Sequence, residues 1–285
     1  ASMIQRAAAS QKRVNEFLNT TPEILQVHDG NEAKIKGAVS FENVSFEYAN
    51  TGIKALKNIN LNIKAGEKFA ILGHTGSGKT TFAQLLLRMF DPKEGKILID
   101  GRDIKLYGLQ HLRKEISYVP QDVFLFSDTV AENINFSAEA GGREAIEKAA
   151  ATAVIDNEIR KFSNGYETMV GERGVTLSGG QKQRISIARA LIRESSGIII
   201  FDDCLSAVDS RTEKEILSNL KDYLSNKTAI IITHRIPAGF EFDKIIVLEE
   251  GKIIEEGKHD ELLSKNGYYA YLFEEQRKGS HQGEI

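Results

Sequence analysis

Short apolar runs separated by helical stretches recur along most of this chain. Between residues 39 and 48, apolar side chains alternate with polar ones, and a one-residue shift after Phe41 predicts a strand with a β-bulge. Seven further short strands are predicted at residues 68–72, 96–99, 116–119, 198–201, 228–232, 244–248 and 252–254. Several of them lack alternation, which is typical of strands covered on both faces.

Helical patterns lie between the predicted strands. Apolar spacing predicts helices over residues 82–89 and 185–192, and a more polar pattern predicts one over 143–162. Strands that alternate with helices indicate an α/β domain with a largely parallel sheet. The first 19 residues predict a helix with little of its own to pack against, residues 20–37 a linker or surface loop, and the globular body is expected from Ala38.

Composition narrows the function. The formal charge of −3, from 37 basic and 40 acidic residues, provides no general basic surface for nucleic acid, so any bound anion needs a local site. The single cysteine, Cys204, rules out an intramolecular disulfide and fits a reducing compartment such as the cytosol. No run approaches the ~20 apolar residues that cross a bilayer, so the chain is expected to be soluble as given.

A glycine-rich segment after the strand at 68–72 has the pattern G-x-x-x-x-G-K-T. Its glycines allow backbone amides to curl around phosphate oxygens, and the following helix adds the partial positive charge of its N-terminus. Lys79 is expected to reach the β- and γ-phosphates and Thr80 to offer its hydroxyl to Mg²⁺. The alternative is a glycine-rich turn with a solvated lysine. The predicted nucleotide-binding residues here are Gly73, Thr75, Gly76, Ser77, Gly78, Lys79, Thr80 and Thr81.

Two adjacent carboxylates follow the apolar run at 198–201. P-loop proteins need an acidic residue at the end of a neighbouring strand to hold the metal, and Asp202 is predicted to fill that role. Taken alone, such an aspartate is as well explained by a helix cap or a turn. Together with the P-loop it indicates a nucleoside triphosphatase or a kinase, without choosing between them.

A second anion site is predicted about a hundred residues after the first. Ser178 caps a helix whose first turn contains Gly179 and Gly180, so a hydroxyl and free amides face the same point. The alternative is an ordinary capped helix with a basic face. The run LSGGQ followed by KQR, however, resembles the signature sequence of the ABC ATPases.

The resemblance to ABC ATPases covers residues 38 to about 275, with a tail at 276–285. It implies an α/β fold: a P-loop NTPase core with a mainly parallel sheet, an antiparallel β subdomain, and an inserted helical subdomain at about 122–178. The implied cofactors are ATP and Mg²⁺. Its signature residues, Ser178, Gly179, Gly180 and Gln181, are expected to bind nucleotide held by a partner domain.

Other residues acquire roles only through this resemblance. Tyr48 resembles the aromatic residue that stacks on adenine, the alternative being a core tyrosine on a strand. Gln121 resembles the glutamine that contacts Mg²⁺ or the attacking water, so the implied metal ligands are Thr80, Asp202 and Gln121. The run 206–209 resembles the D-loop, and His234 the switch histidine that contacts the γ-phosphate. The expected catalytic residues are Asp203, His234, Gln121 and Lys79.

Three segments resemble the exporter branch of the family. They are the N-terminal helix, TMVGERGVTLSGGQ at 168–181, and the C-terminal KHDELLSKNGYYAYLFEEQ. The resemblance implies the ATPase domain of a membrane exporter, excised from its transmembrane half and located at the cytoplasmic face of the membrane. The expected partners are that transmembrane domain and a second nucleotide-binding domain arranged head to tail.

Two alternatives stay open at this point. A soluble ABC ATPase of the chromosome-maintenance or translation type would need a long coiled-coil insertion or a second cassette, and neither is present in the sequence. A P-loop kinase or other phosphotransferase outside the ABC family does not explain LSGGQ.

Asp203 stands where most active members of the family have glutamate. The missing methylene retracts the carboxylate by roughly 1.5 Å, and a misplacement of about 1 Å can cost on the order of 10²-fold in rate. Cys204 and Leu205 also replace the usual Pro and Thr, and the run DD-x-LSAVD resembles the weaker half of heterodimeric exporters. We therefore expect a slow site at this chain's own P-loop, within a heterodimer. Because His234 is retained, a slow homodimer stays open as an alternative.

Overall fold

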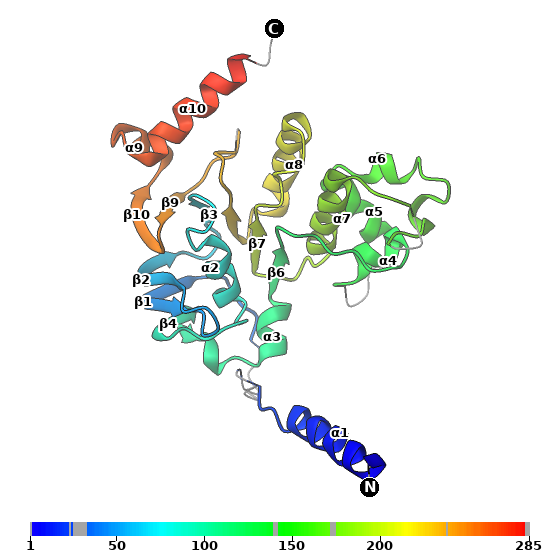
Figure 1. Ribbon diagram of the computed structural model, residues 1–285. Coiled ribbons are helices and arrows are strands. Elements are labelled where there is room, and N and C mark those ends of the chain that lie inside the picture. Colours follow the sequence, from blue (N-terminus) through cyan, green and yellow to red (C-terminus); the bar gives the residue numbers. More distant parts are fainter. Residues whose placement is uncertain are drawn as a thin grey trace.

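The computed structural model describes residues 2–22, 24, 33–138, 142–171, 175–237 and 239–282. Figure 1 shows a body of two sheets with helices around them, from which the N-terminal helix α1 (Ser2–Leu18) projects. The described side chains of α1 are exposed, including Ile4 and Phe17. This agrees with the prediction of a helix with little to pack against.

The larger sheet has six strands in the order β10-β9-β3-β8-β7-β6. All neighbours are parallel except β9 and β10, which are antiparallel. Every residue of β7 and β8 is buried, which explains why their sequences are continuous apolar runs. The strands are β3 (Lys68–Leu72), β6 (Ile116–Val119), β7 (Ile198–Asp202), β8 (Thr228–Ile232), β9 (Lys244–Glu249) and β10 (Lys252–Gly257).

The smaller sheet is antiparallel, with the order β2-β1-β4-β5. Its strands are β1 (Val39–Glu47), β2 (Lys54–Ile63), β4 (Glu94–Ile99) and β5 (Arg102–Asp103). The register of β1 shifts between Phe41 and Val44, so the predicted bulge is confirmed. The long strand β2 was missing from the prediction, because lysines and asparagines interrupt its apolar positions.

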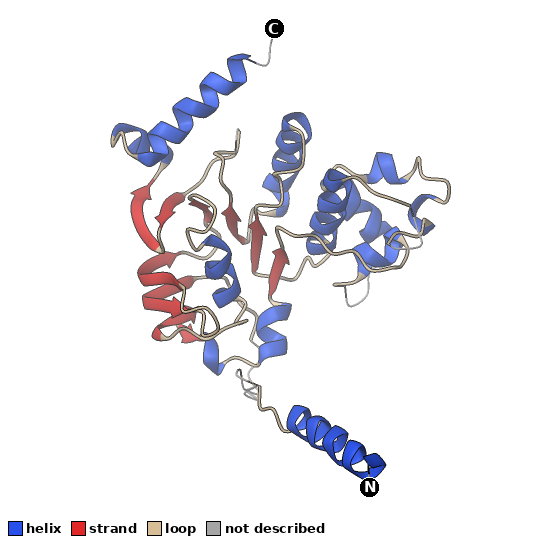
Figure 2. Cartoon of the chain, viewed as in Figure 1, coloured by secondary structure: helices blue, strands red, loops and turns tan. Residues whose placement is uncertain are grey.

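The helices form groups around the larger sheet (Figures 1 and 2). Helix α2 (Lys79–Leu86) packs against the smaller sheet, where the rings of Phe82 and Phe41 stack with centroids 4.2 Å apart. A second group contains α4 (Val130–Asn135), α5 (Arg143–Thr152), α6 (Asp156–Ile159) and α7 (Gly179–Leu191), with the 3₁₀ turn η2 (Gly165–Glu167). The remaining elements are η1 (Ile104–Leu106), α3 (Leu109–Lys114), α8 (Ser210–Tyr223), α9 (His259–Ser264) and α10 (Tyr268–Gln282).

One predicted helix is wrong in detail. The pattern at 143–162 was expected to form a single helix, but α5 ends at Thr152 and α6 begins at Asp156. Val154 lies between them with a φ of 55°, a left-handed conformation that interrupts the helical path. Its carbonyl oxygen accepts a hydrogen bond from Arg184 of α7, so the break ties the two helices to α7.

The arrangement confirms the predicted α/β fold class, with a mainly parallel sheet, an antiparallel sheet and a helical group. Among the described residues, no helix combines the length and apolar character needed to span a membrane. The carboxyl ends of the central strands β3, β7 and β8 lie side by side, because these neighbours are parallel. Residues that follow those three strands are therefore brought to one edge of the sheet.

Candidate nucleotide-binding site

The glycine-rich segment forms a tight loop between β3 and α2. Gly78, at the N-cap of α2, has a φ of 106°, and a Cβ placed on it would lie 2.4 Å from the carbonyl oxygen of Ala55 in β2. Only glycine fits there, since both the backbone conformation and the close approach exclude a side chain. Ser77 Oγ is buried and has no hydrogen-bond partner. An orphaned hydroxyl in such a loop fits an anion-binding role, because buried polar atoms are normally paired.

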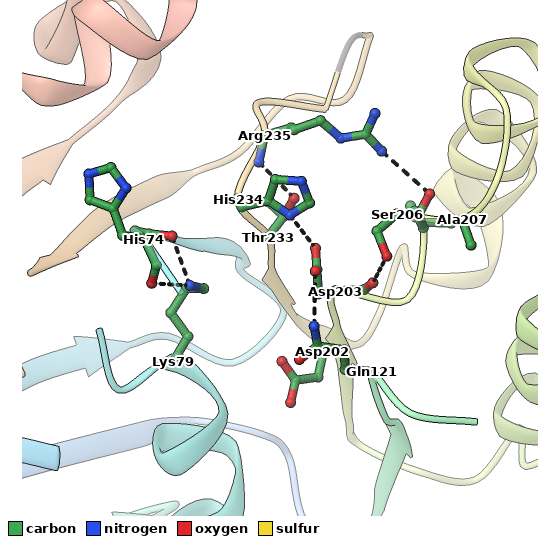
Figure 3. Close-up of polar contacts among 12 residues, drawn as sticks. His74, Lys79, Gln121, Asp202, Asp203, Ser206, Ala207, Thr233, His234 and Arg235 are labelled. Atoms are coloured by element: carbon green, nitrogen blue, oxygen red, sulfur yellow. Dashed lines mark hydrogen bonds and ion pairs between the residues drawn. The ribbon is translucent and has the colours of Figure 1, made fainter. Parts of the chain in front are cut away.

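Lys79 folds back over this loop. Its Nζ donates hydrogen bonds to the carbonyl oxygens of Gly73, at 2.7 Å, and His74, at 2.8 Å (Figure 3). Burial lowers the pKa of Lys79, while Asp203 and Asp202 act in the opposite direction. The ammonium is thus held at the mouth of the loop by carbonyl groups that a triphosphate can replace.

Asp202 is the last residue of β7 and is 1% exposed. Its Oδ1 accepts a hydrogen bond from Thr80 Oγ1 at 3.3 Å, and its Oδ2 accepts one from the hydroxyl of Tyr118 at 3.1 Å. Burial raises the pKa of Asp202, although both hydrogen bonds act to lower it. A buried carboxylate beside a threonine hydroxyl fits a hard divalent cation such as Mg²⁺, which binds oxygen ligands and keeps several waters.

Three predicted catalytic side chains converge next to this pair (Figure 3). His234 Nδ1 lies 2.9 Å from Asp203 Oδ1, and Gln121 Nε2 donates to Asp203 Oδ2 over 3.5 Å. Gln121, Asp203 and His234 follow β6, β7 and β8 respectively, so the parallel sheet explains their convergence. Asp203 has a φ of 45°, and its amide donates to the carbonyl oxygen of Ile232, which turns its carboxylate toward His234.

Tyr48 lies beside the first turn of α2. Its hydroxyl bonds to Thr81 Oγ1 and to Gln84 Oε1, both at 2.9 Å, and its ring is in edge contact with Phe46 and Phe90. The side chain is partly buried. It is therefore a fixed aromatic residue near the P-loop, and the Thr81 side chain faces Tyr48.

The signature residues are on a different part of the molecule. Ser178 and Gln181 form a reciprocal capping box at the start of α7, with Ser178 Oγ accepting from the Gln181 amide and Gln181 Oε1 accepting from the Ser178 amide. Figure 1 shows α7 on the other side of β6 and β7 from α2. The chain thus does not bring its own signature residues, Ser178, Gly179, Gly180 and Gln181, to its own P-loop.

The roles of two residues at these sites were not predicted from the sequence. Tyr118 holds Asp202, and its only signal was a polar hydroxyl within the apolar strand β6. Glu158 of α6 accepts hydrogen bonds from Gln181, at 2.9 Å, and from Arg184, at 2.7 Å, and so fixes the start of α7. Nothing in the sequence pattern pairs Glu158 with α7. Residues 172–174 of the exporter-like stretch lie outside the described residues.

Comparison with known proteins gives consistent matches. The model of the family "ABC transporter" matches residues 56–206. The chain is 46% identical over 237 residues to the ATP-dependent lipid A-core flippases of Escherichia coli K12 and Salmonella typhimurium LT2, which covers 83% of this chain and 40% of each flippase. A solved bacterial Atm1-family ABC exporter with ATP bound has a TM-score of 0.89 and 38% identity, covering 96% of this chain and 48% of that one.

These relatives decide between the alternatives. The chain spans less than half the length of the relatives that it matches. A phosphotransferase outside the ABC family is excluded by the family match, and the shared fold is that of an exporter. The P-loop, the signature helix and the relatives together establish that the chain belongs to the ABC transporter family and is an ATPase domain of the exporter type.

Proposed function

We propose that this chain is the motor domain that binds and hydrolyses ATP to drive substrate export by a membrane ABC transporter. The observation that carries the proposal is the convergence of Thr80, Asp202, Asp203 and His234 at the sheet edge that also bears the glycine-rich loop. Carboxylates and a histidine beside an anion cradle are the groups that phosphoryl transfer to water needs.

The proposed reaction converts ATP and water into ADP and phosphate by in-line attack. The loop amides and Lys79 bind the triphosphate, while Thr80, Asp202 and Gln121 hold a Mg²⁺ ion, which when bound neutralises charge on the transferred phosphoryl group. Asp203 accepts a hydrogen bond from the attacking water, and His234 approaches the γ-phosphate. The 2.9 Å contact between His234 and Asp203 supports this pairing of roles.

The length of Asp203 supports a slow reaction at this P-loop. The carboxylate lies one methylene closer to the backbone than that of a glutamate, and it is within hydrogen-bond distance of His234. Retraction of a base by about 1 Å can lower a rate on the order of 10²-fold. The signature residues of the same chain are intact, so this chain would still complete the site of a partner.

A head-to-tail dimer is the assembly that this arrangement supports. The P-loop and the signature helix lie on separate parts of the chain, on either side of β6 and β7 (Figure 1). Tyr48 is proposed to stack on adenine at one side, with Ser178 and the amides of Gly179 and Gly180 supplied by the second domain, in a homodimer or a heterodimer. Closure of the pair around the γ-phosphate is the mechanical output.

An exposed apolar face supports a membrane-domain partner. Phe124, Phe126 and Phe136 are 67%, 36% and 63% exposed, and Phe126 contacts both of the others. Met169, which forms a β-bridge with nearby Thr129, is also exposed. Exposed apolar clusters of this kind mark interaction sites. We assign the face to the transmembrane domain, which would place this chain at the cytoplasmic surface of the membrane.

The test is nucleotide binding and hydrolysis by the chain itself. Titration calorimetry with Mg-ATP is expected to give a saturable heat that EDTA abolishes, and colorimetric phosphate release should accompany it. Lys79→Ala should lower phosphate release at least 10²-fold, because the lysine neutralises charge on the transferred group. Lys93→Ala, at an exposed lysine outside the loop, is the matched control. Absence of any saturable heat in the wild-type chain would exclude the proposed function.

A further inference from the structure

Hydrogen bonds hold the backbone of the loop that carries His234 on both sides of the histidine. On one side, the Thr233 amide donates to the carbonyl oxygen of Ile71 in β3. On the other, the Ile236 amide donates to Oε1 of Gln276 in α10, at 3.1 Å. Since Ile71 is next to the last residue of β3, the first anchor ties His234 to the strand that leads into the P-loop.

The second anchor spans a cleft. Arg235, Ile236 and Pro237 line one side of it, and Phe273, Gln276 and Arg277 of α10 line the other. The Ile236 side chain packs against the apolar cluster to which Tyr268 and Leu272 of α10 also belong, and the Gln276 side chain holds the Ile236 backbone amide. Arg235 adds contacts with Leu205 and Glu213 on the other side, so the Gln276 side chain is the contact through which α10 acts on the position of His234.

Helix α10 is itself fixed to the same frame as the P-loop. Tyr269 is 1% exposed in a cluster with Ala70 and Leu72 of β3. Glu255 of β10 accepts hydrogen bonds from the amides of Tyr268 and Tyr269 at the start of the helix. The Tyr268 hydroxyl lies 3.4 Å from Nδ1 of His74 in the P-loop. A helix anchored in this way can define where the switch loop sits relative to the nucleotide.

We propose that Gln276 is a positioning residue for hydrolysis, whose side-chain oxygen sets the switch loop so that His234 meets Asp203 and the γ-phosphate. The inference rests on the proposed ATPase function and adds a role for the C-terminal helix within it. Gln276 does not contact the reacting atoms, so its effect is expected on turnover and not on ATP binding. Loss of one positioning hydrogen bond is worth roughly 3- to 10-fold in rate.

Two substitutions at Gln276 test its side-chain oxygen, the hydrogen-bond acceptor, separately from the rest of the side chain. Gln276→Glu keeps an oxygen in reach of the Ile236 amide, whereas Gln276→Met has similar length and lacks a strong acceptor. We expect the Met variant to lose about 3- to 10-fold in kcat with KM for ATP within about twofold of wild type, and the Glu variant to keep wild-type kcat within about twofold. Glu274→Met, at an exposed position of the same helix, is the control.

A second readout does not depend on activity. Amide hydrogen exchange at Ile236 should accelerate in the Met variant and stay slow in the Glu variant, because only the latter retains the acceptor. In a His234→Ala background, the Met and Glu variants should have equal kcat, since the histidine that Gln276 positions is gone.

Several results would overturn the inference. They are wild-type kcat in the Met variant, equal losses in the Met and Glu variants, or a Met-specific loss that persists without His234. Unchanged exchange at Ile236 would also contradict it, even if the Met variant were less stable. A wild-type chain that binds Mg-ATP and hydrolyses it, together with any of these results, refutes the role of Gln276 alone. A wild-type chain that does neither refutes the proposed function, and the inference with it.

Discussion

Asp203 combines two features that bear on rate. It is one methylene shorter than the glutamate usual at this position of the family, and it adopts a left-handed backbone conformation with a φ of 45°. Its carboxylate is nevertheless paired with His234 at 2.9 Å and approached by Gln121 at 3.5 Å. In the mechanism that we propose, these groups supply the charges for hydrolysis, and the distance from the Asp203 carboxylate to the attacking water limits the rate.

Asp203→Glu should raise the steady-state ATPase rate. The added methylene extends the carboxylate toward the water, and a gain of roughly 10- to 100-fold in kcat is expected for a repositioned base. Phosphate release at saturating Mg-ATP, at equal protein concentration, measures it. Asp203→Asn, which has the same length and is a much poorer base, should fall below wild type. An Asp203→Glu variant that hydrolyses no faster than wild type would contradict the geometric argument.

At the scale of the elements, the P-loop is held in place by the sheets on either side of it. Gly78 touches the backbone of β2, which belongs to the antiparallel sheet, while the loop starts from β3 of the parallel sheet. The Tyr48 hydroxyl adds a further link from the end of β1 to α2. The phosphate cradle is thus clamped where two sheets meet, which fixes the direction of its amides before a nucleotide arrives.

Two alanine substitutions distinguish steric clamping from backbone conformation. Gly78→Ala places a Cβ 2.4 Å from the Ala55 carbonyl oxygen, whereas a Cβ on Gly76, where φ is 82°, meets nothing within 4 Å. We expect Gly76→Ala to cost about 1 kcal/mol of unfolding free energy through its left-handed conformation alone. Gly78→Ala should cost at least about 2 kcal/mol more and weaken Mg-ATP binding.

Urea unfolding monitored by circular dichroism, together with calorimetry for Mg-ATP, measures both variants. Equal losses of stability for Gly76→Ala and Gly78→Ala would show that the contact with β2 does not matter. An unchanged affinity for Mg-ATP in a folded Gly78→Ala variant would show that the contact between the loop and β2 does not set the direction of the loop amides.

At the scale of the whole molecule, the P-loop and the signature lie apart on one chain, and we propose that each belongs to a different composite site. The P-loop follows β3 and the signature begins α7, on opposite sides of β6 and β7 (Figure 1). The signature is held rigidly within its own group, since Glu158 binds both Gln181 and Arg184. A rigid presentation of this kind suits recognition by a second domain, because little ordering is required on association.

Complementation tests the composite site. Lys79→Ala removes the P-loop function of one chain and Ser178→Arg blocks its signature, so each variant alone should be nearly inactive. In the mixed dimer, one site has both intact halves, and random pairing should restore about a quarter of wild-type activity. No recovery from two folded, dimerising variants would contradict head-to-tail pairing. Activity of either variant alone at the wild-type level would contradict composite sites.

Most of the strands and much of the site were predictable from local sequence. Continuous apolar runs specified the buried strands, and the glycine pattern with Lys79 and Thr80 specified the loop, because these depend on backbone chemistry between neighbours in the chain. The strand β2 was missed, since polar residues interrupt its apolar face, and the break at Val154 was missed because helical periodicity continues across it.

The contacts between distant residues were decided by the tertiary structure alone. Tyr118 on Asp202, Glu158 on the signature helix and Gln276 on the switch loop join residues 84, 23 and 40 positions apart. No local pattern encodes such a pair, because strand order and helix docking determine which side chains meet. By itself the sequence determined the glycine-rich loop that we propose to bind phosphate and the ends of most strands. The fold decided where each carboxylate lies and which residues hold it there.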